Sequence, residues 1–351
     1  MDWACILSGG AGVRLWPKSR KTFPKQFLQI VGDKSFLEMT YDRVKRIIPP
    51  EKIHIVTHIN YREHLRMLLS NVKDENLIFE PEQKETLACV SLACIHILKK
   101  DPDSVLGIFP SDHFISKTDK FESAIKKGYE IAKKGHIVCF GIAPTRADTN
   151  YGYIKLGREL EKGVFTAERF VEKPDAKRAR YLVKSKYFWN SGIYIFKISV
   201  FLKELKRYMP YCYDIFMRIF SSISTESYID ELKKGYKLLD KISVDKAIME
   251  KTKRLVVLTA DFEWDDVGSW SAFERILTKD ENANVIMAEA ITHETKNCII
   301  FSNKFVIALG IKDTILISVD DAILVCHKSK EREIKEIIQT IALNEKYKKY
   351  L

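Results

Sequence analysis

Apolar and polar positions alternate along residues 3–260 in a way that predicts strands and helices in turn. Short apolar runs predict buried strands, and longer stretches with apolar residues three or four positions apart predict helices. The expected strands are 3–7, 53–57, 77–79, 105–109, 136–141, 164–171 and 255–259. The expected helices between them are 36–48, 61–70, 86–99 and 121–134. Strands and helices that alternate at this period predict right-handed crossovers and a Rossmann-like, mostly parallel sheet flanked by helices, an α/β fold.

The pattern changes between residues 282 and 326, where short apolar runs follow one another closely. The runs are 298–301, 305–309, 314–319 and 322–326. They predict small β elements and no strand–helix units. A final amphipathic helix carries Ile334 and Ile338 on one side and is expected to pack on the domain or on a second copy of the chain. We therefore expect one domain over residues 1–280 and a second over 281–351.

Charge and cysteine content restrict the class of partner and the compartment. The net charge of +11 would fit nucleic acid, but the basic residues are spread along the chain, so a polyphosphate ligand and no nucleic-acid partner are expected. The seven cysteines form no C-x-x-C pair, which favours a reducing compartment. Neither a membrane-length apolar run nor a basic leader is present, so we expect a cytoplasmic protein with no membrane partner.

A glycine-rich loop follows the first expected strand and is the strongest candidate for a ligand site. Its glycines are Gly9, Gly10 and Gly12, and its cations include Arg14, Lys18, Arg20, Lys21 and Lys25. Glycines let backbone amides approach an anion closely, and the cations exceed what a turn requires. The spacing fits neither the dinucleotide fingerprint nor the P-loop. The loop is therefore predicted to hold a polyanion such as a phosphate chain.

The residues from Gly9 to Phe27 read GGAGVRLWPKSRKTFPKQF without interruption. This run resembles the signature of the sugar-1-phosphate nucleotidyltransferases, and within them of the mannose-1-phosphate guanylyltransferases. The resemblance implies the nucleotide-diphospho-sugar transferase fold, with residues 1–280 as the catalytic domain and 281–351 as a small left-handed β-helix piece plus a C-terminal helix. It implies that GMP is transferred from GTP to α-D-mannose 1-phosphate, which gives GDP-mannose and pyrophosphate. Because the sequence ends at residue 351, we expect the phosphomannose isomerase domain fused to longer relatives to be absent.

The same resemblance assigns the nucleotide site. Arg14 and Lys25 are the expected catalytic residues and hold the triphosphate. The expected nucleotide-binding residues are Leu7, Ser8, Gly9, Gly10, Gly12, Glu80, Thr86 and Ser111. Glu80 is chosen because guanine presents N–H donors and its pocket needs acceptors. The segment 84–89 departs from the family pattern, with Glu85 in place of asparagine, which leaves acceptance of another nucleotide open.

Two acids are the expected metal ligands. Asp112 follows the strand 105–109, and Asp266 lies in the acidic stretch after the strand 255–259. Taken alone, Asp112 could instead cap a turn, and the stretch around Asp266 could be a solvated acidic turn. The resemblance implies that both carboxylates bind one Mg²⁺, which also binds the nucleotide and the sugar phosphate.

Three further motifs are expected to face the sugar phosphate. Gly152 allows close approach of the backbone, Glu172 accepts from sugar hydroxyls and Lys173 pairs with the phosphate, as the resemblance implies. Asn190 offers both a donor and an acceptor. Asp245 opens another expected helix, and its sequence context leaves a capping role and a substrate contact equally open.

The expected reaction needs no general base, because a phosphate monoester is largely ionised near neutral pH. The protein has only to align two anions and to neutralise the charge that moves to the leaving group. Other readings remain open. The chain could use another nucleoside triphosphate or hexose 1-phosphate, or it could bind GDP-mannose as a regulatory relative without turnover. A homodimer is also expected.

Overall fold

The computed structural model describes residues 1–10 and 12–351; Ala11, the variable position of the glycine motif, lies outside the described residues. The chain forms two compact units, and each is made of several segments. The first unit comprises residues 1–9, 40–111 and 115–264, and the second comprises 10–39, 112–114 and 265–351. The expected division at residue 280 cuts the sequence at a single point, which is a different kind of boundary from the one between these two units. It therefore stays a prediction.

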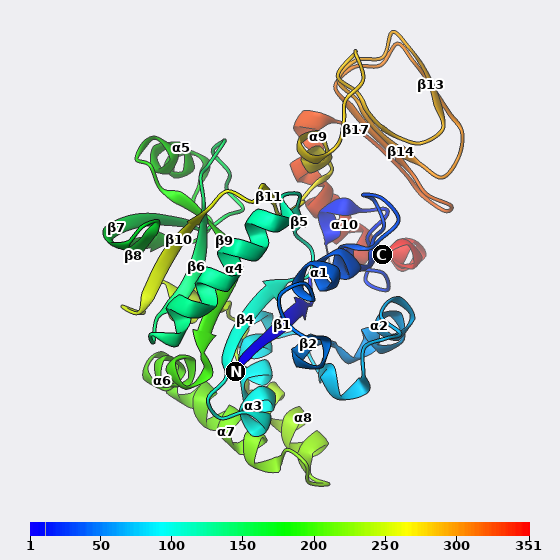
Figure 1. The fold of residues 1–351 in the computed structure, drawn as a ribbon. Coiled ribbons are helices and arrows are strands. Elements are labelled where there is room, and N and C mark those ends of the chain that lie inside the picture. The colour runs from blue at the N-terminus through cyan, green and yellow to red at the C-terminus, as the bar shows by residue number, and fades with distance from the viewer. Residues whose placement is uncertain (11) are drawn as a thin grey trace. The chain divides into compact units, whose positions relative to one another are not determined.

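The first unit is built on a nine-stranded sheet with the order β3-β2-β1-β4-β9-β6-β10-β8-β7 (Figure 1). Its strands are β1 (Asp2–Ser8), β2 (Ile53–His58), β3 (Leu77–Glu80), β4 (Val105–Pro110), β6 (Ile137–Ile142), β7 (Tyr153–Glu161), β8 (Val164–Val171), β9 (Phe188–Lys197) and β10 (Leu255–Ala260). The short strands β5 (Phe114–Ile115) and β11 (Trp264–Asp265) lie where the chain passes from one unit to the other.

Strand directions divide this sheet into parts. β3, β2, β1 and β4 are mutually parallel, and so are β6 and β10. β9 lies between β4 and β6 and is antiparallel to both. The expected α/β fold is confirmed, with β9 and the β7–β8 pair as its antiparallel elements. β9 begins at Phe188, so Asn190 lies inside this strand.

Helices cover both faces of the sheet (Figure 1). They are α1 (Phe36–Val44), whose second half belongs to this unit, α2 (Arg62–Leu68), α3 (Glu85–Lys100), α4 (Thr118–Lys133), α5 (Ala176–Lys184), α6 (Ile198–Tyr208), α7 (Pro210–Ser222) and α8 (Tyr228–Leu238). α3 packs on β1, β2 and β3, and α4 packs on β4, β6, β9 and β10. Because successive strand residues point to opposite faces, Cys139 joins the core under α3 while Phe140 packs against Gly128 of α4.

The second unit contains the β-helix-like part. Its strands are β12 (Val285–Met287), β13 (Ala290–His293), β14 (Ile299–Ser302), β15 (Val306–Leu309), β16 (Thr314–Ser318) and β17 (Ile323–His327), followed by α10 (Ile334–Ala342). β12, β14 and β16 stack in parallel, as do β13 and β15. Inward residues such as Ile299 and Ile315 form a core with Leu15 and Trp270. The β-helix-like piece expected here is confirmed.

Helix length and hydropathy bear on a membrane partner. Within residues 1–10 and 12–351, no helix is both long and apolar enough to cross a bilayer.

Candidate active site

The glycine loop enters the second unit with Gly10 and Gly12. Gly12 has a φ of 59°, in the left-handed region that side chains disfavour. A Cβ at Gly12 would lie 2.4 Å from the Cβ of Lys25, so only glycine lets the backbone pass this close to Lys25. A Cβ at Gly10 would meet no atom within 4 Å. The loop is thus tight against the protein at Gly12 and open at Gly10.

A cavity of about 260 Å³ in the second unit brings five predicted residues together. It is lined by Gly12, Val13, Arg14, Leu15, Lys25, Asp112, Asp266, Gly268 and Lys335. Both predicted cations and both predicted carboxylates therefore share one cavity, although they come from three separate segments of the chain. Sequence analysis missed Lys335, because α10 was assigned from its apolar face alone.

Lys25 links the two acids of this cavity. It is only 4 % exposed, and its Nζ donates to Asp112 Oδ2 at 2.7 Å and to the backbone carbonyl of Asp266. The ammonium also lies over the ring of Phe36, with Nζ 5.6 Å from the ring centre. Burial would raise the pKa of the Asp112 carboxyl, but the charges of Lys25 and His113 lower it below its ordinary value. Asp112 is therefore an ionised carboxylate near neutral pH.

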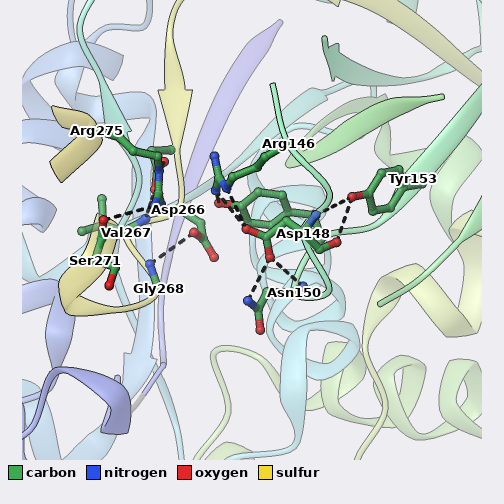
Figure 2. Close-up of polar contacts among 11 residues, drawn as sticks. Arg146, Asp148, Asn150, Tyr153, Asp266, Val267, Gly268, Ser271 and Arg275 are labelled. Carbon is green, nitrogen blue, oxygen red and sulfur yellow. Dashed lines mark hydrogen bonds and ion pairs between the residues drawn. The ribbon is translucent and has the colours of Figure 1, made fainter. Parts of the chain in front are cut away.

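The two adjacent acids Asp265 and Asp266 have different surroundings (Figure 2). Asp265 is bound by Arg275 through two hydrogen bonds of 2.6 and 2.9 Å and also accepts from the backbone N–H of Val267 at 2.8 Å. Asp266 accepts from the backbone N–H of Gly268 at 3.2 Å and lines the cavity. Val267 has a φ of 45°, a strained conformation for a β-branched residue. The fixed Asp265 thus holds a strained turn that presents Asp266.

Four of the nucleotide-binding residues predicted in the first unit lie at the ends of β1 and β4: Leu7, Ser8, Gly9 and Ser111. The backbone N–H of Ser111 donates to the carbonyl of Leu7 at 3.0 Å, which ties these ends together. The carbonyl of Ser8 accepts from Thr57 Oγ1 at 2.6 Å, and that of Gly9 accepts from the Gln83 side chain at 3.3 Å. The carboxyl end of β1 is therefore fixed by hydrogen bonds from neighbouring segments.

Glu80, the residue predicted to contact the base, lies inside the first unit. It is 2 % exposed and accepts from Cys89 Sγ at 2.7 Å and from the Tyr236 hydroxyl at 3.0 Å. Burial raises its pKa to about 7, although these two hydrogen bonds lower it. The structure thus gives Glu80 protein partners for both carboxylate oxygens, and its contact with a base stays a prediction.

The first turn of α3 contains the segment that departs from the family pattern. Glu85 has a φ of 62°, a region that asparagine tolerates far better than glutamate. Its neighbour Thr86 uses Oγ1 to accept from the backbone N–H of Val244 at 2.9 Å. The unusual residue in the sequence therefore occupies a strained backbone position, and the next side chain is bound to another part of the same unit.

The four predicted sugar-phosphate residues lie together in the first unit. A Cβ at Gly152 would be 2.6 Å from Glu172 Oε2, so the carboxylate lies directly against this glycine. The carbonyl of Gly152 accepts from the backbone N–H of Asn190 at 2.8 Å. Lys173 Nζ pairs with Glu172 Oε1 at 3.0 Å, and the Glu172 side chain is only 7 % exposed. Burial together with nearby Asp245 raises the pKa of Glu172, against the charge of Lys173.

A hydrogen-bonded group beside these residues was not predicted as a unit. Asp245 Oδ1 accepts from Asn190 Nδ2 at 3.0 Å and from the Tyr194 hydroxyl at 2.5 Å, and Asn190 Nδ2 also donates to the Tyr194 hydroxyl at 2.7 Å. On β9, Asn190 and Tyr194 lie on either side of an irregularity in the pairing with β6, at which Gly192 has a φ of 73°. Because this irregularity interrupts the regular alternation of side chains, the spacing of the two residues gave no signal for the group.

Arg146, in the loop before β7, was also missed (Figure 2). Its guanidinium lies over the ring of Trp189, 4.9 Å from the ring centre, and donates to the hydroxyl of Tyr151 at 2.8 Å. Asp148 pairs with Arg146 at 2.9 Å and accepts through Oδ1 from Asn150. This network fixes the loop that leads to Gly152, and the local sequence alone did not reveal it.

Comparison with known proteins agrees with this geometry. Residues 3–283 match the model of the nucleotidyl transferase family, and residues 288–341 match that of a MannoseP isomerase/GMP-like beta-helix domain. The chain is similar to mannose-1-phosphate guanylyltransferase 2 of Escherichia coli O157:H7, with 36 % identity over 98 % of this chain and 74 % of that protein. It is 34 % identical to mannose-1-phosphate guanylyltransferase of Klebsiella pneumoniae, over 98 % of this chain and 75 % of that protein.

A solved structure supports the same assignment. The crystal structure described as mannose-1-phosphate geranyltransferase from Thermus thermophilus superposes with a TM-score of 0.90 and 31 % identity, over 97 % of this chain and 99 % of that one. The fold, the β-helix-like piece and the long similarity in sequence lead to one conclusion. The chain is a nucleotidyltransferase and belongs to the mannose-1-phosphate guanylyltransferase family.

Proposed function

We propose that the enzyme transfers GMP from GTP to α-D-mannose 1-phosphate and releases pyrophosphate. The observation that carries this proposal is the cavity of the second unit, where Arg14, Lys25, Asp112 and Asp266 meet. Two cations beside two carboxylates suit a polyphosphate and its counter-ion, whereas a neutral ligand would need neither. The identity of the nucleotide and of the sugar phosphate in this proposal is taken from the names of the relatives.

In this proposal, Arg14 and Lys25 bind the triphosphate. Lys25 is buried and held by Asp112 and Phe36, so its charge is already oriented before a ligand arrives. An oriented charge stabilises the phosphate oxygens as negative charge moves to the leaving pyrophosphate. The open space at Gly10 suits the approach of a phosphate group to the backbone.

Asp112 and Asp266 are the proposed ligands of Mg²⁺. The donor set fits this ion, because Mg²⁺ prefers oxygen ligands and is usually bound through one or two carboxylates together with substrate phosphates. No group of three or more His, Cys, Asp or Glu side chains that could hold a metal occurs in the part of the chain that the structure describes, so side chains of these types would supply two ligands at most here. The contacts of the Lys25 ammonium with both residues indicate that this part of the cavity favours a cation. When bound, the ion would offset the charge of the phosphates.

The cluster of the first unit is the proposed sugar-phosphate site. Lys173 carries an exposed ammonium that can pair with the phosphate, while Glu172 and Asn190 offer oxygen acceptors to sugar hydroxyls. The phosphate monoester is largely ionised near neutral pH and needs no base. Its oxygen attacks the α-phosphate in line, the bond to the β-phosphate oxygen breaks, and pyrophosphate leaves with the electron pair.

A matrix of substrates tests the proposal. Four nucleoside triphosphates are each combined with mannose 1-phosphate and glucose 1-phosphate, and release of pyrophosphate is followed with Mg²⁺, with a chelator, and after Mg²⁺ is restored. We expect turnover only with GTP and mannose 1-phosphate, loss with the chelator and recovery with the metal. Preferential turnover of another pair of nucleotide and sugar phosphate would show that the proposed substrates are wrong. Binding of GDP-mannose without turnover would indicate a regulatory relative.

The proposal also covers the compartment, the oligomeric state and the partners of the enzyme. We propose a cytoplasmic homodimer with no nucleic-acid or membrane partner. Light scattering should give twice the mass of the 40.7 kDa chain. Retention on DNA or on lipid vesicles at physiological salt would contradict the expected partners.

A further inference from the structure

We propose that Asp245 is a further sugar-binding residue, whose carboxylate accepts a hydrogen bond from one hydroxyl of the hexose 1-phosphate and so contributes to the choice of sugar. The inference rests on the proposed function of Asn190 and Glu172. It concerns a side chain for which the sequence left a helix cap and a substrate contact open.

The surroundings of Asp245 argue against the capping role. Asp245 begins a short π-helix (Asp245–Met249), and no side-chain cap is formed at its start. The preceding Ser243 instead accepts from the backbone N–H of Lys246 through its hydroxyl, at 3.4 Å. The helix therefore does not use the carboxylate of Asp245. π-helical turns disturb the regular backbone ladder and occur often at functional sites.

The hydrogen bonds of Asp245 fix one oxygen and leave the other available. Oδ1 accepts from both Asn190 and Tyr194, at 3.0 and 2.5 Å. Among the described residues, no group donates to Oδ2, and the residue is half-buried. Tyr194 is fully buried, so the carboxylate is held from the protein side. A half-buried carboxylate oxygen held in this way is a ready acceptor for a hydroxyl donor.

The charges around Asp245 select the kind of ligand. Burial is the largest cause of the raised pKa of Glu172, and the charge of Asp245 is the next. The two carboxylates therefore lie close enough to repel. Glu250 contributes in the same direction, and Lys173 opposes it. Acceptors placed next to one cation suit a ligand with several hydroxyl donors and one phosphate. This is the chemistry of a hexose 1-phosphate.

Substitution of the single acceptor tests the proposal. In Asp245→Asn, the amide oxygen can still accept from Asn190 and Tyr194, while an N–H₂ group replaces Oδ2. We expect the KM for mannose 1-phosphate to rise about 10–100-fold, as for loss of a hydrogen bond to a charged group. The KM for GTP and the melting temperature should stay within error. Calorimetric titration with mannose 1-phosphate alone should show the same loss of affinity. Lys246→Ala, at the exposed next position, is the matched control and should change none of these values.

Deoxy analogues identify the contact. We expect one of the 2-, 3-, 4- and 6-deoxy derivatives of mannose 1-phosphate to be used by the wild-type protein with a kcat/KM about 10–100-fold below that for mannose 1-phosphate. For Asp245→Asn, the same derivative and mannose 1-phosphate should differ little in kcat/KM, because the variant already lacks the contact. The inference would be overturned if every analogue lowered kcat/KM equally in the wild type and in Asp245→Asn, or if Asp245→Asn raised the KM for GTP as much as the KM for mannose 1-phosphate. Asp245 would then be a structural residue. Wild-type protein without turnover would instead overturn the proposed function, so the two failures are distinguishable.

Discussion

The cavity of the second unit and the sugar-phosphate cluster of the first unit use carboxylates in opposite ways. In the cavity, Asp112 lies against the ammonium of Lys25, and the pKa of its carboxyl is lowered despite burial. In the cluster, Glu172 pairs with Lys173 but also lies near Asp245, and burial together with the charge of Asp245 raises its pKa against that pairing. A carboxylate paired with a buried cation suits a site for a polyanion and its counter-ion, whereas two neighbouring carboxylates suit the neutral hydroxyls of a sugar. The contrast supports the proposal that each unit serves a different part of the chemistry.

The largest expected effect comes from removing the central charge of the cavity. We predict that Lys25→Ala lowers kcat by about 100–1000-fold, because a charge that stabilises the transition state is lost. Steady-state release of pyrophosphate measures the effect. Lys21→Ala changes the same charge in the same loop, but Lys21 does not line the cavity, so this control should retain near-normal turnover. Equal activity of the two variants would remove the cavity from the mechanism.

A second prediction concerns a buried carboxylate of the first unit for which no cation partner occurs among the described residues. Glu80 is contacted by Cys89 and Tyr236, with Cys5 nearby, and burial raises its pKa to about 7. The folded protein then holds a proton that the unfolded chain releases above its ordinary pKa near 4.5. Stability should therefore fall as the pH rises from about 4.5 to about 7.

Denaturant unfolding of wild type and Glu80→Gln at pH 5 and pH 7.5 measures this contribution. The free energy of unfolding of the wild type, relative to the variant, should fall by roughly 2 kcal/mol between the two pH values. A constant difference would mean that Glu80 keeps an ordinary pKa.

Two glycines of the same loop offer a smaller and sharper comparison. Gly12→Ala puts a Cβ against Lys25 at a φ of 59°, and we expect it to lower stability by about 2 kcal/mol and to reduce kcat. Gly10→Ala meets no protein atom, so its melting temperature should be unchanged while the KM for GTP rises about tenfold. An unchanged KM in Gly10→Ala would show that nucleotide does not approach this backbone.

The smallest expected effect is a gain in stability. Glu85 has a φ of 62°, and asparagine adopts this conformation more readily, so Glu85→Asn should stabilise the protein by about 0.5–1 kcal/mol. The same change at the partly exposed Glu82, which has no positive φ, should give no gain. Thermal unfolding distinguishes the two variants. If Glu85→Asn also changes the preference among nucleotides, the departure at this position affects the base site as well as the backbone.

Local pattern predicted much of the fold and some of the candidate site. Apolar runs gave β1, β4, β6 and β10, because buried strands are visible as short continuous segments. The meeting of Asp112 and Asp266 followed from their places in recognisable motifs. Other features depend on contacts between segments far apart in sequence, which no local period encodes. Examples are the bond between Asn190 and Asp245, and Lys335 in the cavity.

The second unit is assembled from three separate segments, and this has a consequence for synthesis. Lys25 pairs with Asp112 and with Asp266, which lie 87 and 241 positions further along the chain. On the ribosome, the glycine loop is therefore made long before its last partner emerges. Until residue 266 has left the exit tunnel, the basic segment lacks its complete set of contacts and is exposed to proteases and chaperones.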